Sequence, residues 1–136
     1  MVTIDSKSGL AIYRIGSNHN PGRFMHFILT SIDMLRHEGI NNFIIDFSGF
    51  PTLSTRELMT LVKLASSLPG DSMMLTGIPD NIQGLLKASG LFKIFRIFDD
   101  VQSAMRSVIA ANEESKLKKR IKSREELALK IKSASA

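Results

Sequence analysis

Hydrophobic and polar positions near the middle of the chain change period within a few residues. Asn42–Phe47 carries an almost continuous apolar run, which is typical of a strand covered on both faces. The segment Ser54–Leu68 then places apolar residues three or four positions apart, as in a helix with one side on a core. Ser54 and Glu57 have the spacing of a capping box at the start of that helix. The pattern predicts a buried strand, a short loop and an amphipathic helix.

Similar alternation extends to both sides of this unit and predicts further strands and helices. The expected strands besides the central one are Val2–Asp5, Leu10–Ile15, Ser72–Thr76 and Ile94–Phe98, and the expected helices besides the Ser54 helix lie near residues 24–36, 80–89 and 99–109. Arg96 is expected to point outward, and Asp80 and Asp99 to cap their helices. Strands that alternate with helices favour parallel pairing. The prediction is an α/β fold with a mixed, mostly parallel sheet of four to five strands and about four helices, mainly on one face.

Length and composition limit the class of protein. A chain of 136 residues suffices for one domain with a sizeable core. It contains no cysteine, which excludes disulfides and thiolate chemistry. No pattern of a signal peptide and no apolar run of about 18 residues is present. We therefore expect a soluble, cytoplasmic protein without a membrane span.

The net charge of +5 is concentrated in the last part of the chain. Residues 113–136 contain eight basic and four acidic side chains, which leaves residues 1–112 nearly neutral. We expect a domain over 1–112 followed by a basic tail, helical or disordered, over 113–136. The simplest role of the tail is a solvated helix, and binding to an anionic membrane surface, nucleic acid or an acidic partner are alternatives. Because the tail lacks aromatic residues for stacking, direct nucleic-acid binding is not expected.

No group of residues has the spacing of a catalytic or metal site. The three histidines, His19, His26 and His37, have no acidic partners at ligand spacing, and a zinc site with thiolate ligands is excluded. The glycine-rich motifs that bind phosphates are absent as well. We expect a protein that is not an enzyme and has neither a cofactor nor a metal.

Four short stretches carry a resemblance to a known family. They are Asp46-Phe47-Ser48-Gly49, Leu53-Ser54-Thr55-Arg56-Glu57-Leu58, Leu75-Thr76-Gly77-Ile78-Pro79 and Ser89-Gly90-Leu91-Phe92-Lys93-Ile94-Phe95. In order and spacing they resemble the STAS domain of anti-sigma factor antagonists, a bacterial family of regulators of transcription, over residues 1 to about 110. The resemblance implies the same fold and a regulatory role through binding an anti-sigma factor or another serine/threonine kinase-like protein.

The resemblance also implies where binding and regulation take place. The expected partner-binding residues are Phe50, Leu53, Ser54, Thr55, Arg56 and Met59. Thr55 aligns with the phosphorylatable residue of the family, and Ser54 is the weaker candidate because its hydroxyl suits the helix cap. Ser54 and Glu57 replace the Asp and Gly of the family pattern. The alternative is a STAS scaffold or transporter-associated subunit that lacks the switch and binds its partner constitutively.

Overall fold

One five-stranded sheet organises the molecule in the computed structural model, which describes residues 2–14, 20–49, 54–68 and 72–135. The strands are β1 (Val2–Asp5), β2 (Leu10–Arg14), β3 (Asn42–Asp46), β4 (Met73–Thr76) and β5 (Arg96–Phe98), in the spatial order β1-β2-β3-β4-β5. β1 pairs antiparallel with β2, and all other neighbours are parallel. The predicted mixed, mostly parallel sheet is confirmed.

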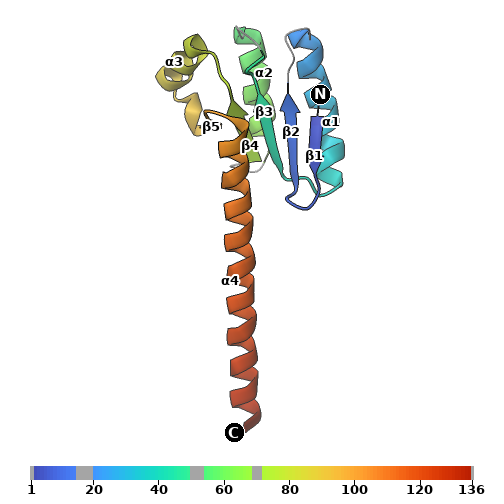
Figure 1. Ribbon diagram of the computed structural model, residues 1–136, viewed down its shortest axis with the longest axis vertical. Coiled ribbons are helices and arrows are strands. Elements are labelled where there is room, and N and C mark those ends of the chain that lie inside the picture. The colour runs from blue at the N-terminus through green and yellow to red at the C-terminus, as the bar shows by residue number, and fades with distance from the viewer. Residues whose placement is uncertain (1, 15–19, 50–53, 69–71, 136) are drawn as a thin grey trace.

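Helices cover both faces of this sheet unequally (Figure 1). They are α1 (Pro21–His37), α2 (Thr55–Ser66), α3 (Asp80–Ser89) and α4 (Val101–Ser135), with a short 3₁₀ helix, η2 (Leu91–Lys93), after α3. Buried residues of α1, α2 and α3 belong to one large core cluster, whereas α4 packs in a smaller cluster on the opposite face. The predicted arrangement of about four helices, mainly on one face, is also confirmed.

The central strand β3 divides its side chains between the two clusters. Phe43 and Ile45 join the large cluster, and Ile44 lies under α4. Successive strand residues point to opposite faces, so a strand covered on both sides needs an unbroken apolar run. Ile44 and Phe47 are both 0% exposed, as the sequence pattern predicts for a central strand.

The start of β5 differs from the sequence-based prediction. Ile94 lies in a turn after η2, and the strand begins only at Arg96. Arg96 does not point freely outward, because its guanidinium lies 5.3 Å from the centroid of the Phe98 ring and donates to the hydroxyl of Ser107. The long aliphatic stem of arginine allows this partial burial with the charge retained.

Two predicted helix caps are also wrong. Pro79, not Asp80, is the residue before α3, and no side chain caps that helix. At α4, the carboxylate of Asp100 rather than Asp99 accepts from the backbone N–H of Ser103, at 2.7 Å. In both places the predicted position is shifted by one residue, which is the usual uncertainty at helix ends.

Helix α4 continues without interruption through the predicted boundary at residue 112. Every residue from Glu113 to Lys130 is exposed, and the helix extends away from the sheet in Figure 1. Where it leaves the sheet, the side-chain amide of Asn112 donates to the carbonyl oxygen of Ser8, at 3.1 Å. The independence of 113–136 from the domain stays a prediction.

Candidate functional site at the carboxyl edge of the sheet

Parallel register places the carboxyl ends of β3 and β4 side by side. Asp46 pairs with Thr76, the last residue of β4. The Asp46 carboxylate accepts from the Ser48 backbone N–H at 3.1 Å, from the Ser48 hydroxyl at 3.0 Å and from the Thr76 hydroxyl at 3.1 Å. These bonds hold the first residues of the β3–α2 connection against the end of β4.

Gly77 makes this packing possible because its backbone comes very close to the turn. It has a φ of +64°, and a Cβ at this position would lie 2.6 Å from the Ser48 nitrogen and 2.9 Å from an Asp46 carboxylate oxygen. Real Cβ atoms essentially never come so close to backbone, and a left-handed φ is unfavourable for residues with a side chain. A glycine is therefore required beside the Asp46 turn.

The other end of the β3–α2 connection is fixed by the predicted capping box. Ser54 has extended backbone angles, and its hydroxyl accepts from the Glu57 N–H at 3.2 Å. The Glu57 carboxylate accepts in return from the Ser54 N–H at 3.1 Å. Both ends of the connection are therefore anchored, one by the Asp46 carboxylate and the other by the helix cap.

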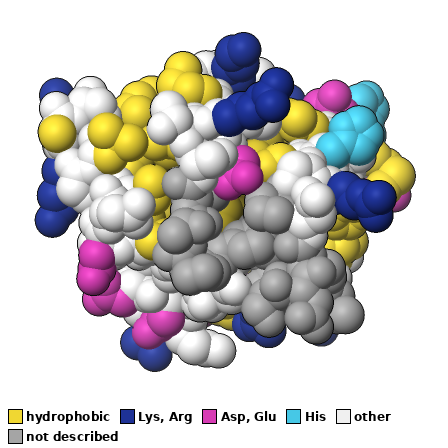
Figure 2. All heavy atoms as spheres, turned by 90° about the horizontal axis from the view of Figure 1, so that it is seen from above, with side chains coloured by type: hydrophobic (Ala, Val, Ile, Leu, Met, Phe, Trp, Pro, Cys, Tyr) yellow, Lys and Arg dark blue, Asp and Glu magenta, His cyan; other side chains and the backbone are white. Residues whose placement is uncertain are grey.

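The residues that begin α2 are exposed to solvent. Thr55 and Arg56 are exposed in the first turn, and Met59 is 47% exposed one turn further along. Thr55 makes no side-chain hydrogen bond to any described residue. Two predicted contact residues, Phe50 and Leu53, lie outside the described residues. Figure 2 views this end of the molecule and shows apolar side chains between separate basic and acidic groups.

Asp46, Ser48, Thr76 and Gly77 all lie in the motifs that carry the family resemblance, but none of them is among the predicted site residues. An Asp followed two positions later by Ser does predict a local turn. The contact between Asp46 and Thr76 joins residues 30 positions apart, so it depends on the strand register. No local pattern could reveal it.

The described residues offer no sign of a metal centre or a membrane-spanning segment. Among them, no three His, Asp or Glu side chains are grouped so that they could hold a metal ion. None of the helices in the described part of the chain combines the length and the apolar character needed to cross a bilayer.

Comparison with known proteins defines the family. The family model described as STAS domain matches residues 4–104, and the chain belongs to this family. Comparison with curated proteins gives no match.

Two solved structures share the fold at low sequence identity. The NMR structure of the protein TM1081 is 20% identical, with a TM-score of 0.61, and the match covers 79% of this chain and 86% of that one. A serine-to-glutamate variant of RsbS from Moorella thermoacetica is 19% identical, with a TM-score of 0.57, and covers 82% of this chain and 97% of its own. The resemblance stated from the sequence motifs is confirmed for the STAS family and for its fold.

Proposed function

We propose that this protein is a regulatory binding module of the anti-sigma factor antagonist type and not an enzyme. Its partner is an anti-sigma factor or another serine/threonine kinase-like protein. The binding surface is formed by the start of α2, with Ser54, Thr55, Arg56 and Met59, and by Phe50 and Leu53 of the preceding connection. Membership in the STAS family and the fold shared with RsbS support this proposal.

The observation that carries the proposal is the exposed first turn of α2 on an anchored connection. Thr55, Arg56 and Met59 face solvent, while Leu58 and Leu61 of the same helix are buried at 2% and 0% exposure. A partner can therefore contact the helix start without disturbing the core. Anchors at both ends of the connection reduce the entropy lost when a partner orders this surface.

Phosphorylation of Thr55 would control the binding electrostatically. A phosphate adds about −1.5 to −2 charges at neutral pH. The free N–H groups of a helix start stabilise such a charge, and its burial in an interface is unfavourable. The modified protein would release its partner without a change of fold. Ser54 is the less suitable acceptor, because its hydroxyl is already bonded to the N–H of Glu57.

The experiment is a binding titration of Thr55→Glu, Thr55→Ala and the unchanged protein against an anti-sigma-type serine kinase of the same organism. We expect Thr55→Glu to weaken binding about tenfold or more, which corresponds to about 1.4 kcal/mol, and Thr55→Ala to bind like the unchanged protein. Mass spectrometry after incubation with the kinase and ATP should find phosphate on Thr55. Binding by all three proteins with equal affinity and without phosphate would reject the switch. Absence of binding by all three would reject the partner class.

The Glu57 carboxylate favours a second candidate function, a STAS scaffold or transporter-associated subunit that binds constitutively. This carboxylate accepts from the Ser54 N–H at 3.1 Å, so a negative charge already lies at the start of α2. It would repel a phosphate on the neighbouring Thr55 and so oppose modification. Glu57→Gly removes this charge. Phosphorylation that is found only in the Glu57→Gly variant would support the scaffold.

A further inference from the structure

A polar hollow lies at the amino edge of the sheet, which is the edge opposite the start of α2. It is formed where the β1–β2 turn, the α1–β3 turn and the middle of α4 meet, and its volume is about 310 Å³. The lining residues are Ser6, Lys7, Ser8, Gly9, Gly39, Asn41, Asn112, Ser115, Lys116 and Lys119. The volume is at the lower end of the range for small-ligand pockets. The hollow is therefore large enough for a small polar ligand.

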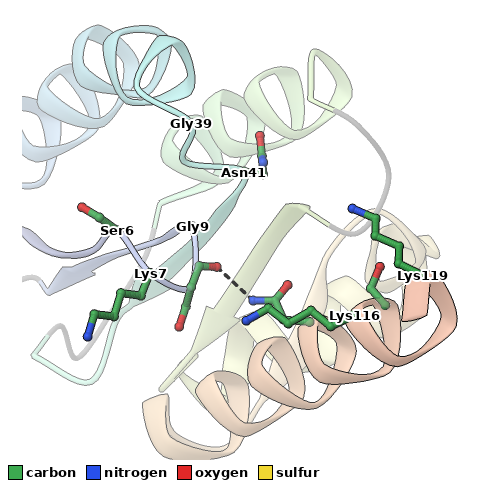
Figure 3. Close-up of a pocket in the computed structure, with 10 residues that line it drawn as sticks. Ser6, Lys7, Gly9, Gly39, Asn41, Lys116 and Lys119 are labelled. Carbon is green, nitrogen blue, oxygen red and sulfur yellow. Dashed lines mark hydrogen bonds between the residues drawn. The ribbon is translucent and has the colours of Figure 1, made fainter. Parts of the chain in front are cut away.

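The charged side chains around this hollow all have the same sign. Lys7 comes from the β1–β2 turn, and Lys116 and Lys119 come from α4, more than 100 residues later in the sequence. In Figure 3, Lys116 and Lys119 extend from α4 beside the hollow, and Lys7 extends outward at its rim. No carboxylate is among the lining residues, and none of the three lysines forms an ion pair with a described carboxylate.

Such an arrangement has an electrostatic consequence. Like charges held around one concave surface repel one another and raise the local concentration of anions. Other cations of α4 illustrate the contrast, because Lys118 pairs with Glu114 at 3.3 Å, one turn away on the same helix. Lys116 and Lys119 thus have no ion-pair partner among the described residues, whereas Lys118 between them does.

We propose that this hollow binds a small phosphate-bearing anion through Lys116 and Lys119, with Lys7 at the rim. A phosphate monoester carries up to two negative charges and three acceptor oxygens. Two ammonium groups, with the hydroxyls and amides of Ser6, Ser115 and Asn41 nearby, supply charge and donors that match it. A monovalent anion such as chloride would satisfy fewer of these donors.

The bound anion would also act on the junction between the domain and the helix that extends from it. Among the described residues, a single side-chain hydrogen bond, from the Asn112 amide to the Ser8 carbonyl oxygen, joins α4 to the β1–β2 turn here. A phosphate held by Lys116 and Lys119 that also accepts from an N–H or hydroxyl group of the β1–β2 turn would add a second link across the same junction. Occupancy would therefore stiffen the part of α4 that leaves the sheet. This proposal does not depend on the proposed partner binding at α2.

The test is a titration of the full chain with inorganic phosphate, followed by amide chemical shifts in ¹H–¹⁵N correlation spectra. Sodium chloride keeps the ionic strength constant. We expect saturable shifts at Ser8, Gly9, Asn112 and Ser115. The double variant Lys116→Gln/Lys119→Gln should weaken phosphate binding about tenfold or more. The matched control, Lys122→Gln/Lys130→Gln, removes the same charge from exposed positions of α4 that do not line the hollow, and should bind phosphate like the unchanged protein.

A second arm distinguishes a free phosphate from a lipid headgroup. The three proteins are sedimented with phosphatidylcholine vesicles that contain phosphatidate, a monoester, or phosphatidylglycerol, a diester. Binding of inorganic phosphate that only the Lys116→Gln/Lys119→Gln variant loses supports a free ligand. Sedimentation with phosphatidate vesicles but not with phosphatidylglycerol vesicles supports a lipid headgroup, provided that only the Lys116→Gln/Lys119→Gln variant loses this binding. Equal losses in the two double variants, or binding in neither arm, would overturn the proposal.

Discussion

The Tyr13 side chain shows how a polar group is accommodated in the core between β2 and α1. Its ring is completely buried, in edge-to-face contact with Phe24 and Phe27. Its hydroxyl lies 2.6 Å from the Ser31 hydroxyl, which also reaches the Phe27 carbonyl oxygen at 2.7 Å. Burial raises the pKa of Tyr13 above its ordinary value, and the hydrogen bond with Ser31 opposes this only partly. The folded protein therefore favours the neutral phenol.

The raised pKa of Tyr13 predicts a loss of stability at alkaline pH. The stability from the neutral phenol is fully present below the unfolded pKa of about 10 and is lost as the pH rises through the folded pKa. Tyr13 is the one tyrosine of a chain without tryptophan, so phenolate absorbance reports it directly. We expect ionisation above about pH 10, together with unfolding. Between about pH 9 and about pH 11, the free energy of unfolding should fall less in the Tyr13→Phe variant than in the unchanged protein. Ionisation at an ordinary pH in the folded state would contradict this prediction.

At the scale of elements, two glycines provide a matched test of the carboxyl-edge geometry. Gly77→Ala should destabilise the protein by about 2 kcal/mol or more, because the new Cβ would meet Ser48 in a left-handed backbone conformation. Gly84→Ala lies inside α3, where a Cβ meets nothing within 4 Å, and should stabilise by about 0.5–1 kcal/mol. Urea denaturation measures both. Equal effects would mean that the turn at Ser48 adjusts freely.

Helices and strands that a local sequence pattern determines could be predicted from the sequence. Contacts that depend on the register of paired strands could not. The apolar run of β3 and the Ser54–Glu57 box at α2 gave correct predictions, because neighbours in sequence determine both. Asp46 and Thr76 meet only after two strands pair. Arg96 was misplaced because its partner Ser107 lies on α4, and no local pattern places that helix beside β5. The hollow at the amino edge could not be predicted either, since its lysines come from opposite ends of the chain.

At the scale of the whole molecule, the exposed part of α4 is expected to contribute little to stability. Val108 packs on the sheet, and Leu117 follows nine residues later, about 2.5 turns on, so it faces the opposite side of the helix. Leu117 therefore does not continue the packed stripe. Deletion of residues 116–136 should shift the thermal midpoint by less than about 2 °C. A shift of more than about 5 °C would indicate that the tail docks on the domain.

The order of the strands in space has a consequence for how the chain folds. Because the order β1-β2-β3-β4-β5 is also the order in sequence, each strand is added beside the one synthesised just before it. No strand has to insert between two that are already paired, which keeps sheet contacts at short sequence separation and shortens the search during folding. The contact from Asn112 to Ser8 spans 104 positions and can form only after all five strands are present. The strands can therefore pair one after another during synthesis, and the packing of α4 on the second face of the sheet is the last step.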